Sequence, residues 1–75
     1  MNNKRRKAII EISQHIEASA CHLRDILGEE QEYYDNMPEN LQGSTRGMES
    51  EEAQSNIESA IESLEDAMTL LEDIY

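Results

Sequence analysis

The stretch DNMPENLQGSTRG, from Asp35 to Gly47, concentrates the turn-forming residues of this 75-residue chain. It holds the only proline and two of the three glycines. Pro38 disfavours helical geometry at the residue before it, so a helix that reaches this stretch should end near Met37. The letters PENL then predict one short turn. The stretch as a whole predicts a corner between two helices.

The segment before the corner has the apolar period of a helix. Its apolar residues recur mostly in alternating steps of three and four. We expect this helix to cover about residues 3–36, with Asn2 or Asn3 as its N-cap. The apolar positions are Ile9, Ile12, Ile16, Leu23, Ile26, Leu27, Tyr33, Tyr34 and Met37.

Several small or polar residues fall within this apolar stripe. Ser19, Ala20 and Glu30 lie on or beside it and should interrupt it. Gly28 costs about 1 kcal/mol relative to alanine inside a helix, which indicates a bend or a close helix contact there. Cys21 lies beside the stripe and is expected to be a small core residue.

The segment after the corner predicts a second helix over about residues 48–75. Ser44, Thr45 or Ser50 could serve as its N-cap. With the corner at about residues 37–47, the two helices have similar lengths and a short connection, so they should be antiparallel. The second apolar stripe comprises Ala53, Ile57, Ala60, Ile61, Leu64, Ala67, Met68, Leu71 and Ile74.

The expected fold is therefore all-α, a single two-helix hairpin domain spanning residues 1–75. Facing residues should have numbers that sum to roughly 84, which pairs Ile16 with Met68 and Leu23 with Ile61. The same register should bring the basic cluster Lys4 to Lys7 near Glu72 and Asp73, whose charges would offset four cations at a helix N-terminus.

The core of such a hairpin is thin, because the chain has no tryptophan or phenylalanine and is 37% hydrophobic. Ordering a chain of this length costs on the order of 110 kcal/mol, which one stripe per helix does not readily offset. We therefore expect self-association into a four-helix bundle. The residues expected to carry it are Ile9, Ile12, Ile16, Leu23, Ile57, Ile61, Leu64, Met68 and Leu71.

Charge is strongly segregated along the chain. The formal net charge is −11, and four of the six basic residues lie between Lys4 and Lys7. Such a surface repels nucleic acid and membranes and favours a basic partner protein. There is no apolar run of membrane-spanning length, one cysteine, and a start too polar for a secretion signal. These features predict a cytoplasmic protein.

Residues that could carry catalysis are few. Glu11, His15 and His22 share a helical face, but a defined metal site usually needs at least three closely spaced ligands. No phosphate-binding loop or catalytic motif is present. We expect no enzyme activity, no metal and no cofactor.

Two groups of residues are candidates for partner binding. Carboxylates along the second helix either form a solvated face or imitate the phosphates of DNA. At the corner, one of the two adjacent tyrosines should face the core and the other should point outward, where aromatic side chains favour interfaces. The basic cluster either pairs with acidic residues, within one chain or between subunits, or binds phosphates. The candidate partner-binding residues are Tyr33, Tyr34, Gln42, Arg46, Glu58, Glu62, Glu65 and Asp66.

From about Leu23 onward, the chain resembles a group of small uncharacterised helical proteins from bacteriophages and mobile elements of Gram-positive bacteria. The resemblance rests mainly on the corner letters NMPENLQGS, from Asn36 to Ser44. The group has no assigned reaction, so the resemblance implies an origin in phages or mobile elements and little mechanism. Small acidic phage proteins in general often bind host machinery, including defence systems, so by analogy we expect an inhibitor or adaptor of a host protein. A purely structural oligomer and an oligomer that sequesters a signalling nucleotide are the alternatives.

Overall fold

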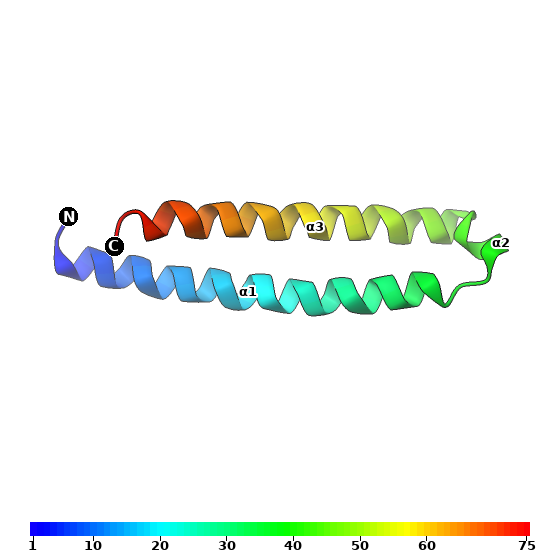
Figure 1. The fold of residues 1–75 in the computed structure, drawn as a ribbon, viewed down its shortest axis with the longest axis horizontal. Coiled ribbons are helices and arrows are strands. Elements are labelled where there is room, and N and C mark those ends of the chain that lie inside the picture. The colour runs from blue at the N-terminus through cyan, green and yellow to red at the C-terminus, as the bar shows by residue number, and fades with distance from the viewer.

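The computed structural model describes all residues from 1 to 75 and shows three helices. These are α1 (Asn3–Asp35), α2 (Glu39–Gln42) and α3 (Thr45–Glu72). Figure 1 shows α1 and α3 lying antiparallel along the whole molecule, with the short α2 at the turn. The molecule measures 58 × 15 × 13 Å. The all-α hairpin expected from the sequence is confirmed.

The helix ends follow from local hydrogen bonding. Asn2 is the N-cap of α1, and its side chain accepts a hydrogen bond of 2.8 Å from the backbone N–H of Arg5. Pro38 lies between α1 and α2, and its carbonyl accepts hydrogen bonds from Leu41 and Gln42. The α2 helix is thus the short turn that the letters PENL predicted.

The second long helix begins three residues earlier than expected. Ser44 is in extended conformation and is its N-cap, although the Ser44 hydroxyl donates to the carbonyl of Leu41 rather than capping α3. Arg46 and Gly47, which were assigned to the corner, therefore belong to the first turn of α3.

A single seam joins α1 to α3, and its residues alternate strictly in steps of three and four. This 3.5-residue period is that of a coiled coil, in which the seam keeps facing the partner helix. Every residue of the seam is buried or half-buried. It comprises Ile9, Ser13, Ile16, Ala20, Leu23, Leu27, Glu30, Tyr34 and Met37 of α1 and the residues just after it, and Gly47, Ser50, Gln54, Ile57, Ile61, Leu64, Met68 and Leu71 of α3.

This seam corrects the stripe expected for the first helix. Ala20 is completely buried, and Ser13 is 6% exposed with its hydroxyl unpartnered. Ile12 and Tyr33 lie outside the seam and are 51% and 47% exposed. Ranking positions by hydrophobicity misplaced the seam, because the regular period and the close approach of two helices select small residues in place of isoleucine.

Gly28 and Cys21 also differ from expectation. Gly28 is exposed, nothing lies within 4 Å of a Cβ added there, and α1 continues through it. Cys21 is an exposed free thiol. Each follows a seam residue directly, and a step of one residue turns a helical side chain by roughly 100° away from the partner helix.

The observed register lies close to the expected one. Three cross-helix contacts join Ser50 to Glu30, Tyr34 to Glu51, and Arg24 to Glu65. The numbers of these pairs sum to 80, 85 and 89, which brackets the expected value of 84.

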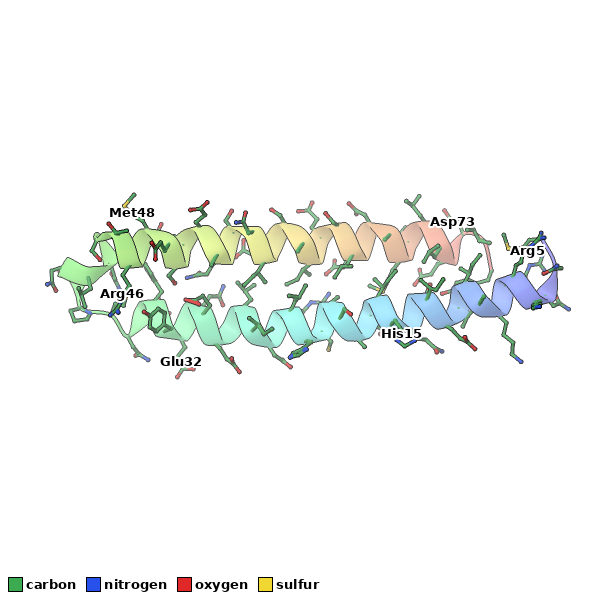
Figure 2. The ribbon with its side chains drawn as sticks, turned by 180° about the vertical axis from the view of Figure 1, so that it is seen from behind. Arg5, His15, Glu32, Arg46, Met48 and Asp73 are labelled. Carbon is green, nitrogen blue, oxygen red and sulfur yellow. The ribbon has the colours of Figure 1, made fainter.

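The expected ion pairing of the basic cluster with the end of α3 does not form within one chain. The only ion pair in the structure joins Arg24 to Glu65. The register places Glu72 at the same level along the rod as Ile12, so the first turns of α1 extend beyond the end of α3 (Figure 1). Figure 2 likewise shows Arg5 farther toward the open end than Asp73. We call residues Lys4 to Lys7 the basic overhang.

Candidate partner-binding surfaces

The seam divides the hairpin into two broad faces of different chemistry. The acidic face is anchored by the Arg24–Glu65 contact across the helices. It comprises Ile10, Glu17, Arg24 and Gln31 of α1 and Glu51, Glu58, Glu65 and Glu72 of α3. The apolar face lies on the other side of the seam. It comprises Ile12, Ser19, Ile26 and Tyr33 of α1 and Arg46, Ala53, Ala60, Ala67 and Ile74 along α3.

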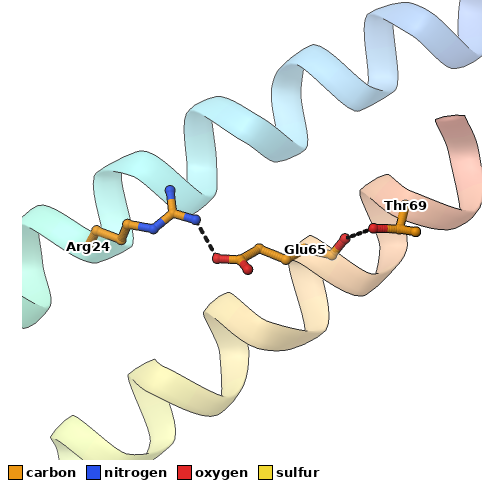
Figure 3. Close-up of polar contacts among 3 residues, drawn as sticks. All are labelled: Arg24, Glu65 and Thr69. Atoms are coloured by element: carbon orange, nitrogen blue, oxygen red, sulfur yellow. Dashed lines mark hydrogen bonds and ion pairs between the residues drawn. The ribbon is translucent and has the colours of Figure 1, made fainter.

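The acidic face contains half of the carboxylates singled out in α3. Glu58 and Glu65 lie on this face, and both are exposed. Glu65 accepts from the Arg24 guanidinium, and its backbone carbonyl accepts a 3.1 Å hydrogen bond from the Thr69 hydroxyl (Figure 3). Glu62 and Asp66 lie beside the face on the outer edge of α3, also exposed.

These carboxylates form a dense and largely uncompensated row. With one ion pair in the structure, 16 of the 17 acidic residues have no cationic partner. Eight acidic residues lie between Glu51 and Asp73. At 1.5 Å per residue they span roughly 33 Å, or one charge per about 4 Å. One strand of B-DNA carries one charge per 3.4 Å, so the two linear densities are similar.

The two adjacent tyrosines diverge as expected. Tyr34 is half-buried in the seam, and its hydroxyl donates a 2.7 Å hydrogen bond to Glu51. That hydrogen bond is the main reason that the pKa of Tyr34 is raised above 10.0; desolvation and the charges of Glu51 and Asp35 add to it. Tyr33 is 47% exposed.

Tyr33 and Arg46 line a shallow hollow of about 240 Å³ where the apolar face meets the corner. Glu30 and Glu49 also line it, so Arg46 lies among carboxylates. Figure 2 shows Arg46 between the helices, whereas Glu32 and Met48 point from opposite outer edges. The remaining lining residues are Ser50 and Ala53.

Gln42 and Gly47 build the corner itself. The Gln42 side-chain amide donates hydrogen bonds to the backbone carbonyls of Tyr34 at 3.1 Å and Met37 at 3.3 Å. It thus supplies a hydrogen-bond donor to carbonyl groups at the end of α1. Gly47 is buried, and a Cβ added there would lie 2.0 Å from the carbonyl oxygen of Gln42. The sequence pattern predicted Gly47 only as a turn former. The signal that identifies its role is its position in the 3.5-residue period.

Of the nine residues expected to carry self-association, eight lie in the seam within one chain. Only Ile12 lies outside it, on the apolar face. The seam is nonetheless incompletely covered, because its only hydrophobic residues classed as buried are Ala20, Met37 and Ile61. Large side chains such as Leu23 and Leu64 keep part of their surface exposed.

Metal-ligating side chains do not converge. His15 and His22 are exposed on α1, and no group of three or more histidine, cysteine or acidic side chains is arranged to hold a metal ion. None of the three helices combines the length and the apolar composition that crossing a bilayer requires. The chain was compared with protein-family models, with curated proteins and with solved structures, and none of them matched.

Proposed function

We propose that this chain is a non-enzymatic, phage-type binding protein that presents its acidic face to a basic surface of a larger host protein. It would act as an inhibitor or adaptor. Its carboxylates would imitate the phosphates of a nucleic acid and so occupy the nucleic-acid-binding site of the host protein. The observation that carries this proposal is the row of eight carboxylates along α3, fixed on a rigid helix and opposed by one arginine.

Electrostatics explains why such a row would favour a basic partner. Carboxylates held on a helix need no ordering when the partner arrives, and a surface of one sign raises the association rate of an oppositely charged protein. The attraction is screened over about 8 Å at physiological salt, so binding should weaken as salt increases.

The proposal is tested by neutralising charge on one helix at a time. The test variant is Glu58→Gln/Glu62→Gln/Asp66→Asn, which leaves the Arg24–Glu65 pair intact. The control is Glu11→Gln/Asp25→Asn/Glu32→Gln, which removes three charges from exposed positions of α1. Each immobilised chain is exposed to host extract, and retained proteins are identified by mass spectrometry with and without competing duplex DNA.

A basic, DNA-displaceable protein should bind the wild type and the α1 control, and bind the α3 variant about tenfold more weakly at low salt. Equal retention by both variants, or retention that DNA does not affect, would refute the mimicry.

We also propose that the hairpin self-associates into a four-helix bundle. The incompletely covered seam supports this, as does the apolar face. Light scattering over a dilution series measures it directly. A stable oligomer with no basic partner would favour the purely structural role over the inhibitor.

A nucleotide-sequestering role receives no comparable support. The basic overhang, Arg24 and Arg46 lie at three separate places along the rod, and the two arginines have carboxylates beside them. A thermal shift with a nucleotide panel would reverse this preference.

A further inference from the structure

We infer that the apolar face docks a second copy of this chain in antiparallel orientation, with the basic overhang of each copy over the acidic corner of the other. The inference rests on the proposed self-association and names its surface and direction. Four features support it: the scarcity of acidic residues on the face, its shape, its size, and the distribution of charge along the rod.

The apolar face and its rim are almost free of acidic residues in a chain of net charge −11. Of the 17 acidic residues, only Glu29 and Glu49 lie at its rim, and Glu30 of the seam lines the hollow beside Tyr33; all three are next to the corner. Elsewhere the rim is uncharged or carries histidine. Its residues there are Ala8, His15 and His22 on α1 and Asn56, Ser63 and Leu70 on α3. Two such chains can approach through this face with the least repulsion.

The shape of the face suits helix packing. A hairpin that is complete by itself needs only the two apolar positions per heptad of a coiled-coil seam, whereas helices in a bundle carry a third. Ile12, Ile26 and Ala60 occupy that third position and are exposed. The small side chains of Ala53, Ala60 and Ala67 allow another helix to approach closely.

The broad side of the rod, along which the apolar face lies, is large enough for a stable dimer. The broad side of the rod measures 58 by 15 Å. This is roughly 870 Å² in projection, close to the ~800 Å² per partner of a standard protein interface. Covering it would also bury the exposed parts of the seam residues.

Charge along the rod determines the orientation. Residues 29–52, at the corner end, contain eight acidic residues and one arginine, a net charge of −7. The basic overhang, at the opposite end, carries four cations and makes no ion pair. Antiparallel docking brings each overhang to the corner of the other copy. Parallel docking would bring the two corners together, and the two overhangs as well.

The face is tested with two neighbouring positions of α3. Ala60→Glu places a carboxylate on the apolar face, and Ser59→Glu places the same group one residue away, on the outer edge. Both residues are exposed in the hairpin, so neither change affects packing within one copy. Ala60→Glu should raise the dimer dissociation constant by about 100-fold, because it leaves a charge unpaired in an apolar interface.

Light scattering measures the mass of both variants, and circular dichroism measures their helix content. Loss of the dimer, with or without loss of helix, in Ala60→Glu alone supports the inference. Equal masses for the two variants would overturn the choice of face. A wild type that is monomeric at every concentration would overturn the self-association proposal itself.

Orientation is tested with one spin label per chain, on Ala8→Cys in a Cys21→Ser background. Ala8 is exposed at the rim of the face near the open end. From the helix rise, the two labels should lie roughly 40 Å apart in the antiparallel dimer and under about 20 Å apart in a parallel one. A dimer with the short distance would overturn the orientation and leave self-association standing.

Discussion

The corner half and the open half of the hairpin share one seam but hold it together differently. In the corner half, the seam is polar: the Ser50 hydroxyl donates to Glu30 at 2.8 Å, Gln54 approaches Ser50, and Tyr34 reaches across to Glu51. In the open half, isoleucine, leucine and methionine fill the seam positions of α3. The same 3.5-residue period therefore carries two kinds of interaction along one molecule.

The two halves of the seam contribute differently: apolar contacts stabilise the hairpin, and polar contacts fix the register of the two helices. Apolar burial stabilises in proportion to area and tolerates sliding, because one isoleucine packs much like another. Hydrogen bonds between buried polar groups have little net value when made but cost about 1 to 3 kcal/mol when left unmade. Polar seam positions can thus fix the register, as they do in coiled coils. Most of the stability should come from the open half, and the alignment from the corner.

The largest expected effect is in the open half. Ile61 is 8% exposed and is the most buried large residue of α3, so Ile61→Ala should lower the free energy of unfolding by about 3 kcal/mol. Urea denaturation measures this change. Met48→Ala is the control, because Met48 is 64% exposed and its truncation should change stability by less than about 0.5 kcal/mol. Equal losses would contradict the assignment of the seam.

The next effect is at the corner and is steric. Gly47→Ala places a Cβ 2.0 Å from a backbone oxygen of α2, so α2 must shift. We expect the free energy of unfolding, measured by urea denaturation, to fall by about 2 kcal/mol. Gly28→Ala is the matched control, because nothing lies within 4 Å of its added Cβ. Alanine is the better helix former, so this change should raise the free energy of unfolding by about 1 kcal/mol. A neutral Gly47→Ala would mean that α2 does not pack on α3 in solution.

The smallest effect concerns the Tyr34 hydrogen bond and depends on pH. Because the pKa of Tyr34 is raised in the folded chain, mainly by its hydrogen bond to Glu51, the folded state favours the neutral phenol. This contribution to stability is present below pH 10 and is lost as pH rises through the higher folded pKa. The phenolate absorbance assigned to Tyr34, by difference from Tyr34→Phe, should therefore appear above pH 10. Glu51→Gln should shift that midpoint toward 10; an unchanged midpoint would rule out the contact.

The hairpin could be predicted from Pro38, its neighbouring turn formers and two helical periods, because those signals are local. The position of the seam could not be found by ranking residues by hydrophobicity. The small residues Ser13 and Ala20 lie in the seam because the two helices approach closely there, whereas the more hydrophobic Ile12 lies outside it. The position of the basic overhang follows from the register alone: a sum near 84 already places Glu72 at the level of Ile12, too far along α1 to meet Lys4. The carboxylate row was visible in the sequence, but its separation from an apolar face required knowing the seam.

The regular 3.5-residue seam also fixes the handedness of the surface. A straight helix drifts by roughly 20° per heptad from such a repeat, so two helices that keep one seam wind around each other to the left. Over the three heptads from Glu51 to Glu72, the carboxylate row therefore turns by about 60° in a left-handed sense. The strands of B-DNA wind to the right. A protein groove that follows duplex DNA could thus match this row only over a short segment, and a partner shaped for this chain should be basic along a short or shallow surface.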